Sequence, residues 1–342
     1  SVQAAVYNVV EIGEVAETSS TYAAAINDNG DAVFNGAIKG TATSSITGGS
    51  QTVFQYYKFP IRLDAIDFED EKVQALFTDE QLADLLNGIV DADTLSILLQ
   101  QNPSRQPIGF SLAYLKPNVG SAESVTLRDN ELSRTNTDYL YDINNAGVSV
   151  GLSTAPYSWQ AFTPEATDDE PEPEASDYWV PELSYQLGMA VVDGQAITLL
   201  PPYQSYGGGY SVANSVNDNG LVAGFGSVNL VDEAAENIET ACTGASTPIN
   251  LCFYNYHISG LRTPGTYNQE LLAFGYTQRG LLWQMNGSQV SAPVVLGFLG
   301  DKNSQSEHSK EGFKAINYFS KANDVNLAGI AVGVSLYSDS EK

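Results

Sequence analysis

Two short runs of oxygen-bearing side chains come closest, by residue type and spacing, to a metal site. They are NDNGD at residues 27–31 and VNDNG at residues 216–220. Asn and Asp oxygens suit Ca²⁺, but no glutamate follows at the spacing of an EF-hand loop. The same residues also explain a tight turn, because Asn, Asp and Gly tolerate positive φ. We therefore expect structural turns, assign no metal and no cofactor, and keep Asp28 and Asp218 as the calcium candidates.

Catalytic chemistry finds little support in the residue types. The chain has two histidines, His257 and His308, which excludes three-histidine and HExxH zinc sites. We interpret His257 as a structural residue of an aromatic strand and His308 as a solvated loop residue. No G-x-S-x-G motif is present, and among 41 Asp and Glu residues any carboxylate pairing is uninformative. We therefore assign no catalytic residue.

A carbohydrate-binding or carbohydrate-active β-propeller remains the alternative. Glycosidases use paired carboxylates about 5–9 Å apart. The discriminating feature is a pocket in which Trp159, Trp179 or Trp283 lies beside such a pair. Packing between strands is the competing interpretation of these tryptophans.

The turn motif recurs along the chain, each time between two short apolar segments. The copies span residues 22–36, 139–151, 212–224 and 322–333. The predicted turn residues are Asn27, Asp28, Asn29, Gly30, Asn144, Asn145, Gly147, Asn217, Asp218, Asn219, Gly220, Asn323 and Asp324. Further short strands precede the later copies, so each unit holds four or five strands. This pattern predicts an all-β, propeller-like repeat fold of antiparallel strands; the alternatives are a β-sandwich or an open β-solenoid.

The repeats organise residues 1–342 into a single β domain. Its cores are expected at about 6–59, 108–162, 187–258 and 280–336, separated by three insertions. The insertion at 64–105 is helical, and Thr78 with Gln81 forms a capping box there. The insertion at 164–184 is an acidic loop, and that at 228–250 is an acidic loop with two cysteines. All three insertions come at the same place in the repeat, after a turn motif and its second strand. We therefore expect them to lie together on one face, which would be acidic.

The net charge limits the classes of partner, and the cysteines indicate the compartment. The net charge of −26 excludes nucleic acid as a main partner, and no apolar run is long enough for a transmembrane helix. Cys242 and Cys252, ten positions apart in a polar segment, are predicted to form a disulfide, with two buried thiols as the alternative. The acidic insertion supplies a partner strip, which consists of Asp168, Asp169, Glu170, Glu172, Glu174 and Asp177.

The motif A-x-x-I-N-D-x-G, together with a W-x-x-N-G hairpin, resembles the extracellular HAF-type repeat. The residues that carry it are 23–36, 211–224 and 282–287. The opening YNVVEIGEV followed by YAAAINDNGD looks like the mature start of a secreted gammaproteobacterial family of unknown function built from such repeats. The resemblance implies export and a β-repeat fold, and brings no catalytic residues. The second copy departs from it at Asn145 and Ala146, and the fourth has residues 325–328 before its Gly.

These observations predict an exported, non-enzymatic interaction or scaffold module of the periplasm, outer-membrane surface or extracellular space. The N-terminal unit lacks its leading strands, which suggests a longer parent chain or a partner that supplies them. A partner protein would bind through the acidic, insertion-rich face or by strand addition. A glycan is the alternative ligand.

Overall fold

The chain folds into consecutive antiparallel sheets, which confirms the all-β expectation. The computed structural model describes residues 15, 18–38, 57–58, 71–86, 91, 93–94, 97, 106–107, 111–127, 138–154, 157–166, 174–181, 186–207, 209–253, 276–297, 299 and 319–335. Among these residues no sheet closes into a barrel, since each strand order has two free ends.

Four sheets follow one another along the chain, and each begins with a hairpin around one turn motif. The first has the order β1-β2-β5-β6, the second β7-β8-β11-β12, the third β13-β14-β15-β16 and the fourth β18-β19. Their strands are β1 (Thr18–Ile26), β2 (Ala32–Ile38), β5 (Ser111–Lys116), β6 (Glu123–Val125), β7 (Tyr139–Ile143), β8 (Ser149–Thr154), β11 (Gln186–Val192), β12 (Gln195–Leu199), β13 (Ser211–Val216), β14 (Leu221–Leu230), β15 (Tyr276–Asn286), β16 (Gln289–Val290), β18 (Ser320–Val325) and β19 (Ala331–Ser335). A short strand, β17 (Val294–Val295), also pairs with β15.

The boundaries between the sheets fall at other places in the sequence than the boundaries between the predicted repeat units. The strand at residues 111–116 was grouped with the turn motif that follows it, but β5 pairs with β2 of the preceding hairpin. The same holds for β11, which pairs with β8, and for β15, which pairs with β14. Each long insertion therefore leaves a hairpin and returns to the same sheet. Among the described strands, the first of the four sheets has four strands and the fourth has two, which is the reverse of the expectation that the N-terminal unit lacks strands.

A β-bulge interrupts the first strand of every hairpin at the same place. The register skips one residue in each case, three positions before the turn asparagine. These bulge residues are Ala24, Tyr141, Asn214 and Asn323. A bulge bends its strand and increases the local twist, so the four hairpins share one curvature.

Consecutive sheets pack face to face through apolar residues. Val33 and Ala113 of the first sheet contact Leu140, Met189 and other buried residues of the second. The second and third sheets enclose Trp283, which is fully buried. Ala223 of the third sheet packs on Ala322 and Val325 of the fourth. The core is thus a series of apolar layers, each of which is formed by residues of two neighbouring sheets.

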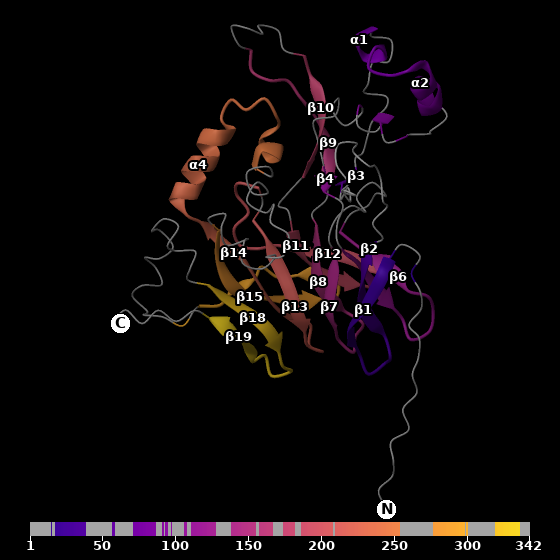
Figure 1. Ribbon diagram of the computed structural model, residues 1–342. Coiled ribbons are helices and arrows are strands. Elements are labelled where there is room, and N and C mark those ends of the chain that lie inside the picture. The colour runs from indigo at the N-terminus through magenta and orange to yellow at the C-terminus, as the bar shows by residue number, and fades with distance from the viewer. Residues whose placement is uncertain are drawn as a thin grey trace, which may run out of the picture.

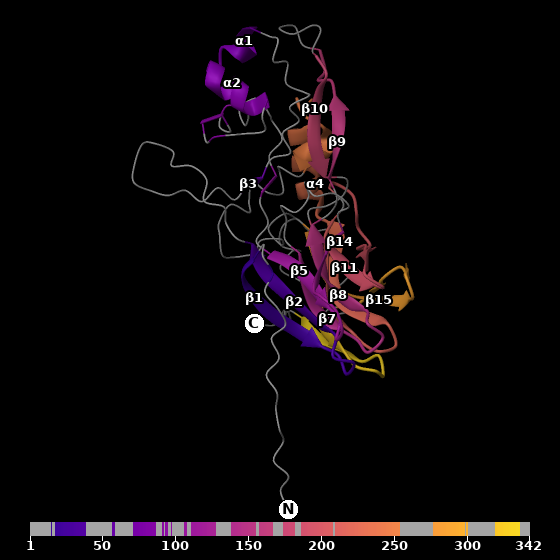
Figure 2. The ribbon, with the colours of Figure 1, turned by 90° about the vertical axis from the view of Figure 1, so that its right-hand side faces the viewer.

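The insertions gather at one end of the stacked sheets, as the sequence predicts. Figures 1 and 2 show α1 (Glu71–Gln74), α2 (Asp79–Leu86), α4 (Asp232–Cys242) and the hairpin β9–β10 at the end opposite the turns. Strand β9 spans Tyr157–Phe162 and β10 spans Ser176–Pro181, while β3 (Tyr57–Lys58) pairs with β4 (Gln106–Pro107). The capping box before α2 is present: the Thr78 N–H donates to Gln81 Oε1 (2.9 Å), and the Gln81 N–H donates to Thr78 Oγ1 (3.2 Å).

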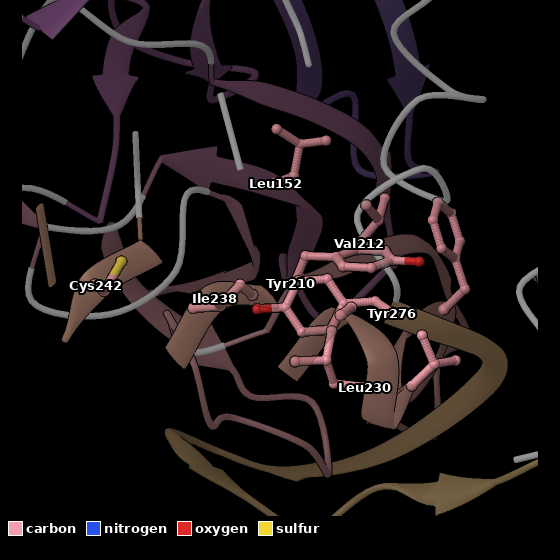
Figure 3. Packing of buried hydrophobic residues seen from close by; sticks show 10 residues of the cluster. Leu152, Tyr210, Val212, Leu230, Ile238, Cys242 and Tyr276 are labelled. Carbon is pink, nitrogen blue, oxygen red and sulfur yellow. The ribbon is translucent and has the colours of Figure 1, made fainter. Parts of the chain in front are cut away.

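The insertion at 228–250 is a helix and not the expected loop. The apolar residues Ala234, Ile238 and Cys242 recur every fourth position, which places them on one face of α4. Figure 3 shows Ile238 beside the rings of Tyr210 and Tyr276, whose centroids are 5.9 Å apart. The predicted disulfide between Cys242 and Cys252 is formed and ties the end of α4 to the helical residues 249–253, with a Cα–Cα distance of 5.8 Å. Within the described residues, no helix has the length and apolar character needed to cross a bilayer.

Candidate functional site

Four hairpin turns with the same internal bonding form the end of the molecule opposite the insertions. Each begins with an asparagine: Asn27, Asn144, Asn217 or Asn326. In every turn, the asparagine N–H donates to the carbonyl four residues on, and its Oδ1 accepts the N–H of that same residue. The asparagine carbonyl accepts the N–H of a glycine three residues on, whose φ is 86°, 80°, 73° or 77°. Positive φ favours glycine at this position.

The turn asparagines also bond to one another and form a ladder along the four sheets. Asn27 Nδ2 donates to the Asn144 carbonyl at 3.0 Å, and Asn144 Nδ2 donates to the Asn217 carbonyl at 2.9 Å. Asn217 Nδ2 continues to the Asn326 carbonyl at 2.8 Å. Each rung joins residues that are 73 to 117 positions apart in sequence. The ladder therefore fixes each hairpin against the next one.

A second row of side chains lies beside the ladder and explains why the second turn departs from the repeat. Asn145 stands between Asp28 and Asp218, and its Nδ2 lies 2.9 Å from Asp28 Oδ2 and 3.1 Å from Asp218 Oδ2. The Asn145 N–H donates to Asp218 Oδ1, and Asn145 Oδ1 accepts the Asp28 N–H. An aspartate at position 145 would place three like charges in a row. The asparagine turns that repulsion into hydrogen bonds.

The fourth turn lies three residues later than predicted. Asn323 and Asp324, expected in the turn, lie in β18, where Asn323 occupies the bulge. The anchor is Asn326, whose Oδ1 accepts the Ile330 N–H at 2.9 Å, and Gly329 supplies the positive φ. Residues 325–328 are thus not inserted before the turn, because most of them form it.

The calcium candidates are turn residues, as the sequence predicts. Asp28 and Asp218 both lie in tight turns, and their carboxylates accept hydrogen bonds from Asn145. Across the part of the chain that the structure describes, no three His, Cys, Asp or Glu side chains are grouped as a metal site. Binding of Ca²⁺ stays a prediction to be tested by chelation.

A pocket of about 420 Å³ opens between the second, third and fourth sheets. Its lining repeats from sheet to sheet, five and three positions before each turn asparagine: Tyr139 and Tyr141, Val212 and Asn214, Lys321 and Asn323. Leu152, Gln186, Phe225 and Gln278 complete the described lining. The sequence prediction missed this pocket, because the two repeat positions carry different residue types in each copy and come together only when the three sheets pack.

The described lining of the pocket holds the Lys321 ammonium and the phenol rings of Tyr139 and Tyr141. The Lys321 ammonium lies 4.9 Å from the Phe225 ring centroid and 5.9 Å from that of Phe319. Burial lowers the pKa of Lys321. Partial burial, and after it the neighbouring Tyr139, raises the pKa of Tyr141 above its usual value. No carboxylate belongs to the described lining.

Of the three tryptophans considered for a carbohydrate site, the structure describes the surroundings of Trp283, and the carbohydrate alternative stays a prediction. Trp283 is fully buried, and its Nε1 donates to the Leu200 carbonyl at 3.0 Å, so it is a packing residue. Trp159 and Trp179 lie opposite each other in the β9–β10 register. Trp283 does not belong to the described lining of the pocket.

The remaining predicted residues divide between the described and undescribed parts of the chain. Glu174 is exposed, and Asp177 lies in β10. The other partner-strip residues and both histidines lie outside the described residues; these are Asp168, Asp169, Glu170, Glu172, His257 and His308.

Comparison with known proteins gives one match. No curated protein and no solved structure matches the chain. Residues 1–342 match the family described as "Protein of unknown function (DUF3466)". Because the match covers the ladder turns, all four sheets and the insertions alike, the chain belongs to this family.

Proposed function

We propose that the chain is an exported, non-enzymatic interaction module that binds a partner protein by strand addition to β19. The observation that carries this proposal is the pairing of the second strand in each sheet. Strand β2 lies between β1 and β5, β8 lies between β7 and β11, and β14 lies between β13 and β15. Strand β19 occupies the equivalent place, and among the described strands it pairs with β18 alone.

An open strand edge offers unpaired N–H and C=O groups to another chain. The exposed side chains of β19 are apolar: Val332 is 59% exposed and Val334 50% exposed, and Ile330 just before the strand is 62% exposed. In the preceding sheets the corresponding surface is covered by the next sheet. A partner that adds a strand to β19 would gain backbone hydrogen bonds and bury this surface.

The ladder ends at the same place. The amides of Asn27, Asn144 and Asn217 each donate to the next turn, but no described turn follows Asn326. A partner whose own turn presented a carbonyl there would continue the ladder. The stacked sheets with this open end also support a propeller-like arc as the fold of the module.

Export and an acidic docking face are supported by other features. The disulfide suits an oxidising compartment. Exposed acids of α2 and α4, among them Asp79, Glu80, Glu236 and Glu239, lie at the insertion end. Together with the net charge of −26 they favour a partner with basic groups.

Co-purification from the native cells in mild detergent tests the proposal, with variants at two edges. V332K/V334K charges the exposed face of β19 next to its open edge, while V294K/V295K adds the same charge to the exposed strand β17 of the third sheet. We expect a stoichiometric partner with the unchanged chain and with V294K/V295K, and its loss with V332K/V334K. In the complex, amide exchange of residues 331–335 should slow markedly. A partner retained equally by both variants would refute strand addition, and turnover of a substrate lost on a single carboxylate substitution would refute the non-enzymatic role.

A further inference from the structure

We propose that the pocket between the second, third and fourth sheets binds a small anionic ligand that carries a six-membered ring. Its anion would pair with Lys321, and its ring would lie against the Tyr139–Tyr141 pair. This site is separate from the β19 edge and needs no partner protein. Its volume of about 420 Å³ falls in the usual range for small-molecule sites.

Lys321 supplies the charge. It makes no ion pair with any described residue, and its ammonium is flanked by the rings of Phe225 and Phe319. Partial burial disfavours its charged form, as the lowered pKa indicates. An anion delivered to the pocket would restore the lost stabilisation of this charge.

The neighbouring acids do not serve Lys321. Asp142 and Asp324 follow pocket residues directly in sequence, but their carboxylates are engaged elsewhere. Asp142 Oδ2 accepts the Val216 N–H at 2.9 Å and lies 2.9 Å from Ser215 Oγ. Asp324 Oδ1 accepts the Val325 N–H at 2.8 Å and lies 2.7 Å from the same hydroxyl. These contacts join the sheets and leave the pocket without a described carboxylate.

The tyrosine pair supplies the flat surface. The Tyr139 and Tyr141 rings are nearly parallel, with an interplanar angle of 8° and centroids 5.9 Å apart. Tyr141 is the bulge residue of β7 and keeps 37% of its surface exposed. A ligand ring could therefore cover Tyr141 without any rearrangement of the core.

Among the carboxamides in the described lining, that of Asn323 completes the recognition surface, because those of Asn214 and Gln278 are bonded within the protein. Asn214 is held by the bond from its Nδ2 to the Ala322 carbonyl (2.8 Å). Gln278 accepts the Tyr210 hydroxyl at 2.8 Å. Asn323 is exposed at the rim, where its amide can reach hydroxyl groups of a ligand. An amide group beside a cation and two phenols suits a hydroxylated acid such as a uronate sugar, and the same charge and rings also suit an aromatic acid.

The test is a titration of the full chain with four probes: glucuronate, glucose, benzoate and acetate. Calorimetry and ¹H NMR detect the binding. At the ligand efficiency usual for small molecules, glucuronate should bind with a Kd of about 1 mM. We expect at least one ring acid to bind at least tenfold more tightly than both glucose and acetate. Binding of glucuronate identifies an acidic sugar, and binding of benzoate alone identifies an aromatic acid.

Three variants connect binding to the named residues. K321Q and Y141A should each weaken binding of the preferred acid at least tenfold. K116Q removes the same charge from β5 outside the pocket and should leave the Kd unchanged. An unchanged melting temperature in each variant shows that the fold is kept. The proposal would be overturned if K321Q and the unchanged chain bound the acid equally well. It would also be overturned if neither ring acid bound at a concentration tenfold above the expected Kd.

Discussion

Replacing the middle rung of the asparagine ladder should destabilise the whole stack. In N144A, two hydrogen bonds are lost: the one from Nδ2 to the Asn217 carbonyl and the one from the Val148 N–H to Oδ1. Each bond contributes about 1 kcal/mol net, and a buried group left unsatisfied adds a further cost of about 1 kcal/mol or more. Because Asn144 is only 4% exposed, we expect a total loss of about 3 kcal/mol.

The size of this loss sets the expected melting temperature. An unfolding entropy of about 2.1 cal/mol/K per residue gives about 0.7 kcal/mol/K for 342 residues. A loss of about 3 kcal/mol then lowers the melting temperature by about 4 °C. Circular dichroism during heating and urea titration both measure it, and the urea midpoint should fall with little change in slope.

N326A is the matched control, because it changes the same residue in the same kind of turn. Its Oδ1 accepts one exposed N–H, from Ile330, and no described turn accepts its amide. We expect a loss of about 1 kcal/mol or less, which corresponds to about 1 °C. Equal losses in N144A and N326A would refute the argument that bonds between sheets, and not bonds within a turn, make the ladder stabilising.

Four further predictions follow from the same geometry. G224A places a Cβ 2.0 Å from a backbone oxygen of β13 and should lower the melting temperature by about 4 °C or more. The Cβ of G287A meets nothing within 4 Å, so this control should lose about 1 kcal/mol of stability. Similar melting temperatures for the two variants would contradict the prediction. Reduction of the disulfide should cost about 3 kcal/mol for a separation of 10 residues, and an unchanged urea midpoint would count against it. N145D should lower stability by about 1 kcal/mol per carboxylate pair at low salt and recover in about 1 M NaCl; a salt-independent loss would exclude charge repulsion. A chelator should leave the melting temperature unchanged, and a large drop that disappears in D28A and D218A would instead reveal a bound cation.

The hairpins could be predicted from sequence because their cause is local. Asn, Asp and Gly at fixed spacing determine the backbone angles of a turn, whatever surrounds it. The prediction placed the fourth turn at the wrong residues, because Asn323-Asp324 has the same sequence as the Asn-Asp pair of the first and third turns. The more reliable signal is an asparagine followed three residues later by glycine, which holds for Asn326 and Gly329 as it does for Asn27 and Gly30.

The sheet phase, the bulges and the pocket could not be read from the sequence, because each depends on distant contacts. The repeat shows which segments recur, but the return of β5 to β2 is decided by pairing across a long insertion. Nothing in residue type marks the bulge, which is occupied by Ala24, Tyr141, Asn214 and Asn323 in turn. The pocket follows from these bulges, because three of the four residues line it.

The separation of the ladder from the insertions has a consequence for how this molecule can vary. The bonds that align the sheets lie at one end, and the long excursions leave and return at the other (Figure 2). A loop there can be lengthened, shortened or exchanged without moving a rung, because loop-closure entropy grows only slowly with length. The fold is thus suited to serve as a display scaffold, in which related chains keep one frame and exchange the segments that it presents.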